Sequence, residues 1–83
     1  MAKYDYSIGA PVYCRDGDCG RLHKVVVDPN TRQVTDLIVK RGFLLTIDRV
    51  LPVDVVERAA GEGIYLSISS EALDNYPEYR SSD

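Results

Sequence analysis

The chain has 83 residues, of which 45% are hydrophobic and 28% are charged, and its formal net charge is −3. This length predicts a single domain, 1–83, with a thin core, and the composition excludes a disordered tail. No apolar run approaches the roughly 18 residues that span a bilayer, and no basic segment followed by a long apolar stretch opens the chain. We therefore expect a cytoplasmic protein that does not insert into membranes.

The basic residues give no sign of a nucleic-acid interface. Ten lysines and arginines are scattered among thirteen acidic residues and are not gathered into one stripe. A surface that follows nucleic-acid phosphates needs clustered cations. We therefore expect no direct binding to nucleic acid.

The first half of the chain predicts three strands. Alternating residues near the end of segment 8–14 predict the first strand, and an Asp-Gly pair within 15–18 predicts a tight turn after it. Segment 19–28 is rich in β-branched residues and ends at a proline-containing turn, which predicts a second strand. Segment 33–41 is predicted to be a third strand, partly covered on both faces.

The second strand is predicted to contain a β-bulge. Leu22 has an even residue number, whereas Val25 and Val27 have odd ones. Because side chains alternate between the two faces of a strand, an unbroken pleat would place Leu22 on one face and the two valines on the other. A bulge near His23 or Lys24 would reconcile the two sets and bend the strand. This bending favours a small, closed barrel over a flat sheet.

The second half of the chain is predicted to begin with a hairpin tip at the apolar run 43–45, which leads into a fourth strand. Residues 53–58 fit a strand and a short helical turn equally well. After a glycine-rich turn, segment 64–69 alternates apolar and polar residues and is the clearest predicted strand.

A short helical turn, 70–73, is expected after that strand, with Ser69 or Ser70 as its cap and Pro77 limiting its length. The last four residues are expected to fray. No repeat or linker divides the chain, so one all-β unit is sufficient. The expected core and the two terminal extensions are about 8–73, 1–6 and 74–83.

Several short segments share an order and spacing along most of the chain. They are Gly9-Ala10-Pro11-Val12-Tyr13, Asp16-Gly17, Gly20-Arg21-Leu22, Val25-Val26-Val27-Asp28-Pro29, Val34-Thr35-Asp36-Leu37-Ile38-Val39, Arg49-Val50-Leu51-Pro52-Val53-Asp54-Val55-Val56, Gly63-Ile64-Tyr65-Leu66 and Ser70-Glu71-Ala72-Leu73. In this order the chain resembles the PRC-barrel family, to which the cytoplasmic domain of the photosynthetic reaction-centre H subunit and the C-terminal domain of the ribosome maturation factor belong.

The resemblance implies a small, strongly twisted antiparallel β-barrel with one or two short helical turns. It also implies docking to partner proteins or self-association, with a homo-oligomer expected and a dimer favoured. The family has no shared catalytic machinery, so the resemblance implies no catalytic residues and no cofactor. The specific roles of the H subunit and of the maturation factor are not carried over.

Cys14 and Cys19 flank a four-residue loop, so their thiols could lie opposite each other across a hairpin. Three interpretations remain open. The first is a reduced, structural pair, the common state of cytosolic thiols. The second is a disulfide that responds to redox conditions. The third is a metal site with His23, although two cysteines and one histidine supply only three of the four ligands of a closed zinc site, and we predict no metal.

Phe43, Leu44 and Leu45 form the candidate interaction surface, because three large apolar residues on a hairpin tip are hard to bury locally. The alternative is that the tip folds under the barrel.

The sequence has no pattern that would give His23 the two partners of a catalytic base, a nucleophile and an acid that orients the imidazole. It also has no glycine-rich loop of the kind that binds phosphate. No enzyme is therefore predicted. The expected function is a protein-docking or self-association module, with a thiol redox or metal sensor at Cys14 and Cys19 as the alternative.

Overall fold

The computed structural model describes residues 6–42 and 45–79. These residues form an all-β protein with two short helical turns, as the sequence predicts. The elements in chain order are β1 (Pro11–Cys14), β2 (Gly17–Val27), β3 (Val34–Arg41), β4 (Ile47–Pro52), η1 (Val53–Val55), β5 (Val56–Ala60), β6 (Gly63–Leu66) and α1 (Ser70–Leu73).

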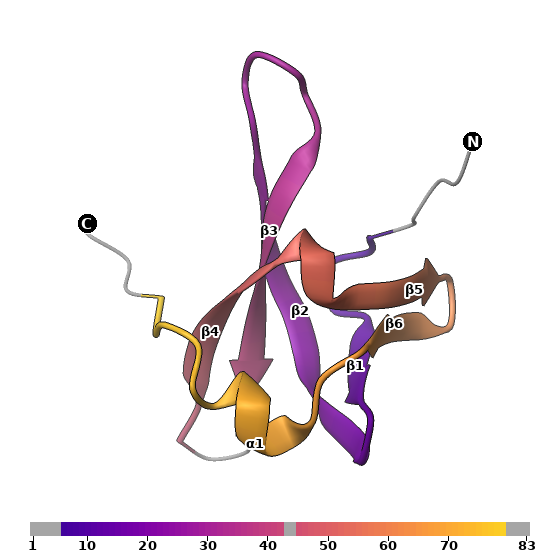
Figure 1. Ribbon diagram of the computed structural model, residues 1–83, viewed down its shortest axis with the longest axis vertical. Coiled ribbons are helices and arrows are strands. Elements are labelled where there is room, and N and C mark those ends of the chain that lie inside the picture. The colour runs from indigo at the N-terminus through magenta and orange to yellow at the C-terminus, as the bar shows by residue number, and fades with distance from the viewer. Residues whose placement is uncertain (1–5, 43–44, 80–83) are drawn as a thin grey trace.

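The strands belong to one mixed sheet in the order β4-β3-β2-β1-β6-β5 (Figure 1). The pair β1–β6 is parallel, with Val12 opposite Ile64 and Tyr13 opposite Tyr65, and the other neighbouring pairs are antiparallel. The prediction of an antiparallel sheet is therefore wrong at this pair. A parallel pair needs a long crossover between its strands, and here β2 to β5 supply it.

The strand order is linear, with β4 and β5 at its two ends. Within 6–42 and 45–79, no ladder joins β4 to β5, so the described sheet is not closed into a barrel. The two end strands are nevertheless consecutive in the chain, because η1 alone connects Pro52 to Val56. The end of β4 and the start of β5 therefore lie close together in space.

Residues 76–79 lie along the outer edge of β4. The amide of Val50 donates to the carbonyl oxygen of Pro77 over 2.9 Å, and the amide of Tyr79 donates to that of Asp48 over 2.7 Å. A covered edge offers no free backbone groups to another strand. This segment, expected within a terminal extension, thus pairs with β4 through a short bridge and covers its edge from Asp48 to Val50.

One face of the sheet carries the core. Leu37 and Val39 of β3 belong to this core and are fully buried. Leu73 of α1 is also fully buried in it. Ile38 lies between Leu37 and Val39 and is also buried, yet it does not belong to the core cluster. The prediction that part of the third strand is covered on both faces is confirmed. The cluster comprises Val12, Cys14, Cys19, Leu22, Leu37, Val39, Leu51, Val55, Val56, Ala59, Ile64, Leu66 and Leu73.

The β-bulge predicted in the second strand is confirmed. The register of β2 against β3 shifts between Leu22 and Lys24, which leaves His23 as the extra residue. Beyond the bulge Val25 packs against the core cluster, as the parity argument requires. Val27 is nearly half exposed, because there the hairpin extends past the body of the protein (Figure 1).

Two predicted strands are shorter than expected. The first begins at Pro11, although backbone bonds to β2 continue before it: the amide of Gly9 donates to the carbonyl oxygen of Leu22 over 2.7 Å, and the amide of Leu22 donates to that of Ala10 over 2.9 Å. The last ends at Leu66, and beyond it the amide of Ser67 donates to the carbonyl oxygen of Val55 at the end of η1. In both places backbone bonds to a neighbouring segment extend past the end of the strand.

The segment 53–58, which fitted helix and strand equally well, contains both: η1 ends at Val55 and β5 begins at Val56. The helical turn at 70–73 is confirmed as α1, and the Ser69 hydroxyl caps it by accepting from the amide of Ala72 over 3.2 Å. Residues 80–83, expected to fray, lie outside the described residues.

Candidate functional site

The connection between β3 and β4 carries the candidate interaction surface. Phe43 and Leu44 lie outside the described residues, whereas Leu45 is 91% exposed and Ile47 is 42% exposed. Leu45 therefore does not fold under the sheet. Leu45 in the connection and Ile47 at the start of β4 thus expose two large apolar side chains to water at neighbouring positions of the chain.

Gly42 sets the path of the chain into this connection. Its φ of +105° lies in a region that side-chain-bearing residues rarely adopt, and an added Cβ would overlap the carbonyl oxygen of Leu45. The strand can turn this sharply only with glycine at this position. Leu45, whose carbonyl oxygen lies against Gly42, has its side chain exposed to solvent.

The two cysteines lie in the β1–β2 hairpin, but they are not directly opposite each other. Cys14 faces Gly17 in the ladder, and the register shifts by one residue next to Tyr13, so Cys19 lies between two paired positions. Both thiols are free, buried and part of the core cluster. The expectation of a four-residue loop is wrong, because only Arg15 and Asp16 form the turn.

Burial governs the chemistry of both thiols. Loss of water raises the pKa of the Cys14 thiol and, more strongly, that of the Cys19 thiol, which also donates a hydrogen bond to Cys14. The nearby Arg41 guanidinium lowers both pKa values, but its effect is smaller than that of desolvation. A thiolate is the species that attacks disulfides and binds metals. The environment of the pair therefore weighs against a redox or metal sensor.

We expect both thiols to resist alkylation in the folded protein. At pH 7 a thiol with an ordinary pKa is a few per cent thiolate, and each unit by which its pKa is raised lowers that fraction about tenfold. Iodoacetamide labelling followed by mass spectrometry should show Cys14 and Cys19 reacting at least about tenfold more slowly in buffer than in urea. Equal rates in the two conditions would contradict the buried, protonated pair.

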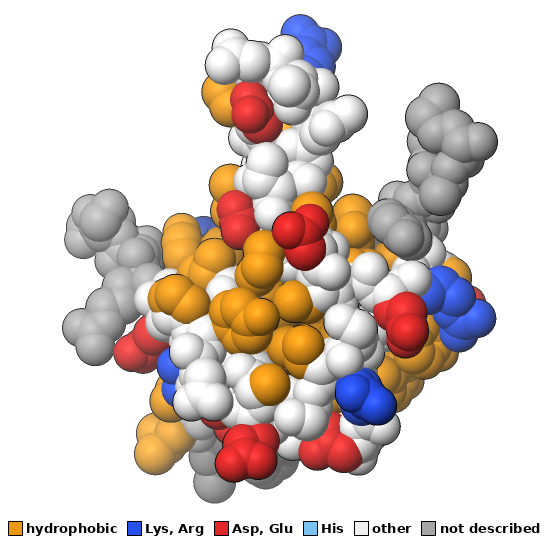
Figure 2. All heavy atoms as spheres, viewed as in Figure 1, with side chains coloured by type: hydrophobic (Ala, Val, Ile, Leu, Met, Phe, Trp, Pro, Cys, Tyr) orange, Lys and Arg blue, Asp and Glu red, His pale blue; other side chains and the backbone are white. Residues whose placement is uncertain are grey.

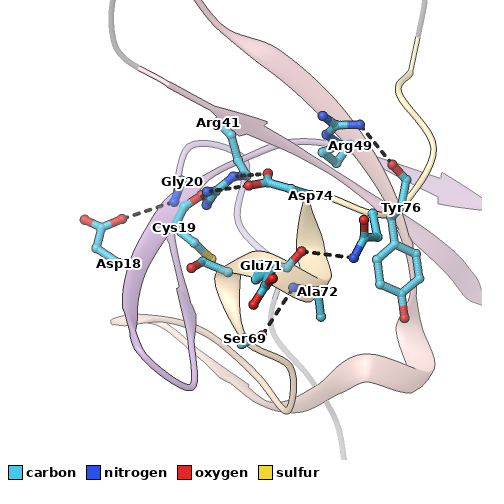
Figure 3. Close-up of polar contacts among 12 residues, drawn as sticks. Asp18, Cys19, Gly20, Arg41, Arg49, Ser69, Glu71, Ala72, Asp74 and Tyr76 are labelled. Carbon is cyan, nitrogen blue, oxygen red and sulfur yellow. Dashed lines mark hydrogen bonds and ion pairs between the residues drawn. The ribbon is translucent and has the colours of Figure 1, made fainter.

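Arg41 joins three elements near the cysteines (Figure 3). Its guanidinium donates to the carbonyl oxygen of Cys19 over 2.8 Å. It also forms a two-point contact with the Asp74 carboxylate, with N–O distances of 2.9 and 3.3 Å. A planar guanidinium fits this double contact, which fixes its orientation. Arg41 thus ties the end of β3 to β2 and to the residue that follows α1.

Arg49 makes a comparable link from β4 (Figure 3): its guanidinium donates to the carbonyl oxygen of Tyr76 over 3.1 Å. Together with the backbone bonds of residues 76–79, this contact holds the C-terminal segment against β4. The two arginines therefore link separate elements of the fold.

His23 lies away from the cysteines in the bulge of β2. Its Nε2 atom is 3.9 Å from a carboxylate oxygen of Asp48 on β4, a distance too long for a hydrogen bond. Among the described residues no three of His, Cys, Asp and Glu come together as metal ligands. The arrangement of Cys14, Cys19 and His23 therefore gives no support to the metal interpretation.

No local pattern predicts the contact between Arg41 and Asp74, which lie 33 residues apart. The contact between β4 and residues 76–79 is likewise not predictable from the sequence.

None of the described helices is long and apolar enough to cross a bilayer. No protein-family model matches this chain, and the curated proteins contain no significant match to it.

Proposed function

We propose that this chain is a non-enzymatic docking module that binds other proteins through the β3–β4 connection. The observation that carries the proposal is the 91% exposure of Leu45. Exposed leucine next to half-exposed Ile47 gives a compact apolar contact, and burial of such contacts drives most protein association. A second copy of this chain is included among the possible partners, with a dimer favoured.

We also propose that the fold is a PRC-type barrel and that the chain is related to that family. The curled sheet supports this, since its two end strands are joined by η1 alone. The amide of Ser67 donates to the carbonyl oxygen of Val55 over 2.8 Å, which adds a bond between the end of β6 and η1. Bulges such as the one at His23 give a short sheet the curvature that closure requires.

A cytoplasmic location and an absence of direct contact with nucleic acid complete the proposal. Two free thiols in the core are typical of proteins kept in a reducing compartment. The scattered cations and the net charge of −3 are unfavourable for binding to phosphate backbones.

The docking surface is tested by changing Leu45 to aspartate and comparing the proteins captured from an extract of the native cell. A partner bound by the wild type would then be purified and its affinity measured by calorimetry. We expect Leu45→Asp to weaken that complex by about tenfold or more, because the new carboxylate would lose its water in an apolar contact without gaining an ionic partner.

Thr46→Asp is the matched control, because Thr46 is the exposed neighbour of Leu45 and the change adds the same charge without removing an apolar side chain. We expect it to leave the affinity within about threefold of the wild type. A partner that binds the wild type and Leu45→Asp equally well would show that docking does not use this surface.

A further inference from the structure

Arg21 and Lys40 lie next to each other on the outer face of the sheet, the face away from the core. Arg21 of β2 is directly opposite Lys40 of β3 in the antiparallel ladder, and their neighbours Leu22 and Val39 belong to the core cluster. Because side chains alternate along a strand, Arg21 and Lys40 point away from that core. Both residues are exposed.

Two cations in these positions repel each other. Paired residues of an antiparallel ladder have Cβ atoms roughly 4.5–5.5 Å apart, and like charges directly opposite each other are unfavourable. Within residues 6–42 and 45–79, neither Arg21 nor Lys40 forms an ion pair. An anion bound between the two side chains would offset the repulsion and give both cations an ionic partner.

A hollow of about 200 Å³, which we call the cationic hollow, opens beside the two cations. Its lining consists of Ile8, Gly9, Arg21, Leu22, His23 and Lys40. The space beside Gly9 is open, since an added Cβ would meet nothing within 4 Å. His23 is the extra residue of the β-bulge, and bulges change the direction of a side chain. Half of the lining residues are thus basic types, and none of those described is acidic.

The guanidinium of Arg21 is held at the edge of the cationic hollow. It donates a hydrogen bond to the carbonyl oxygen of Gly9 over 3.2 Å, and its other N–H groups remain for a ligand. A guanidinium that is already oriented loses less freedom when it binds an oxyanion. Lys40 adds a flexible point charge to the same place.

Two aspartates lie near the cations, and neither takes the place of a ligand. Asp48 is opposite Lys40 on β4, but its carboxylate lies 3.9 Å from Nε2 of His23 and its side chain is only 22% exposed. Asp18 lines a second hollow of about 230 Å³, which shares the two cations, and its carboxylate accepts a backbone amide there over 3.1 Å. The cationic hollow is therefore the more favourable of the two for an anion.

We propose that the cationic hollow binds the phosphate group of a small phosphomonoester. Such a group carries a charge of about −1.5 to −2 at neutral pH, which matches two cations, whereas a carboxylate would neutralise only one. The hollow is smaller than the roughly 300–1,000 Å³ of pockets for drug-sized ligands, so the ligand is small. A single phosphate needs no stripe of cations of the kind that a nucleic-acid backbone requires.

The cations determine which ligand the hollow selects. Ile8 and Leu22 give it an apolar wall that can contact carbon atoms of the ligand. Apolar surface is not confined to this place, because Figure 2 shows hydrophobic side chains gathered over the centre of the body. The phosphate therefore provides the selectivity, and the carbon part of the ligand adds affinity.

An NMR titration of the isotope-labelled full chain with monobutyl phosphate, at neutral pH and constant ionic strength, tests the site. We expect saturable shifts of the amide signals of Gly9, Leu22 and His23, with a dissociation constant of about 1 mM or lower. Butyrate has a similar carbon chain but a single charge. It should bind at least about tenfold more weakly than the phosphate.

Arg21→Gln and Lys40→Gln should each weaken the binding of monobutyl phosphate about tenfold or more, because each removes a charge that contacts the phosphate. Lys24→Gln is the matched control. Lys24 is on the same strand as Arg21, but its ammonium lies 5.5 Å from the centroid of the Tyr79 ring and does not line the hollow. This variant should bind within about threefold of the wild type.

The amide spectrum of each variant shows whether it is folded. If Arg21→Gln is unfolded, Lys40→Gln decides. The absence of saturable shifts up to about 20 mM monobutyl phosphate would overturn the inference, and so would unchanged binding in the folded variants of the two cations. Butyrate that binds as tightly as monobutyl phosphate would refute the assignment to phosphate.

The phosphate site is independent of the proposed docking surface. Leu45 does not line the cationic hollow, so Leu45→Asp should leave the titration with monobutyl phosphate unchanged. Conversely, a docking partner that ignores Leu45→Asp would refute the docking surface and leave the phosphate site standing.

Discussion

Replacing Leu37 with alanine is expected to lower the free energy of unfolding by about 2–5 kcal/mol. Leu37 is fully buried in the core cluster, where β3 is flanked by β2 and β4. The change removes three carbon atoms and leaves a cavity that the surrounding strands fill only partly. A domain of this size is stabilised by about 5–15 kcal/mol at most, so urea unfolding followed by circular dichroism should show a large fall in the midpoint.

Val26→Ala is the control for this change. Val26 lies on the same pair of strands, but it is partly exposed and faces away from the core. Its truncation should change the free energy of unfolding by about 0.5 kcal/mol or less. Similar losses in the two variants would mean that Leu37 does not lie in a core that excludes water.

The bulge at His23 shows what the sequence could reveal. Parity along a strand is a local property, and the side chains of Leu22 and Val25 must share one face if both are to be buried. A single inserted residue is the smallest change that permits this, and the register shift lies at that position. Local patterns such as this one also predicted the strands of the first hairpins and the Ser69 cap.

The parallel pairing of β1 with β6 could not be predicted in the same way. Val12 and Ile64 are 52 residues apart, and alternation within each strand is compatible with several partners and with either direction. The choice depends on how the intervening strands pack. The same reason hides the segment 76–79 on β4, since its pairing uses backbone groups that carry no sequence signal.

The candidate site was predictable in part. The exposure of Leu45 follows from an apolar run beside a glycine, which is a local signal. The relation of Cys14 to Cys19 was not predictable, because a register shift beside Tyr13 moves Cys19 out of the paired position. The contact of Arg41 with Asp74 depends on where α1 ends relative to β3, which only the folded chain determines.

Replacing Gly20 with alanine is expected to lower the free energy of unfolding by about 2–4 kcal/mol. Gly20 has a φ of +145°, which is strained for any residue with a side chain. An added Cβ would also overlap the backbone carbonyl oxygen of Lys40 on β3, which the β2–β3 ladder holds in place. Urea unfolding measures the loss, and amide exchange should show it concentrated in the β2–β3 pair.

Two other glycines separate the strain from the overlap. Gly17 also has a positive φ, +126°, but an added Cβ there would meet nothing within 4 Å, so Gly17→Ala should cost only the strain, about 1–2 kcal/mol. Gly61 has neither a positive φ nor a close neighbour, so Gly61→Ala should change stability by about 0.5 kcal/mol or less. If Gly20→Ala cost no more than Gly17→Ala, the strands β2 and β3 would not approach as closely at Gly20 as the register requires. Losses in the expected order, with Gly20→Ala the most costly and Gly61→Ala the least, would support the close approach of Gly20 to the carbonyl oxygen of Lys40.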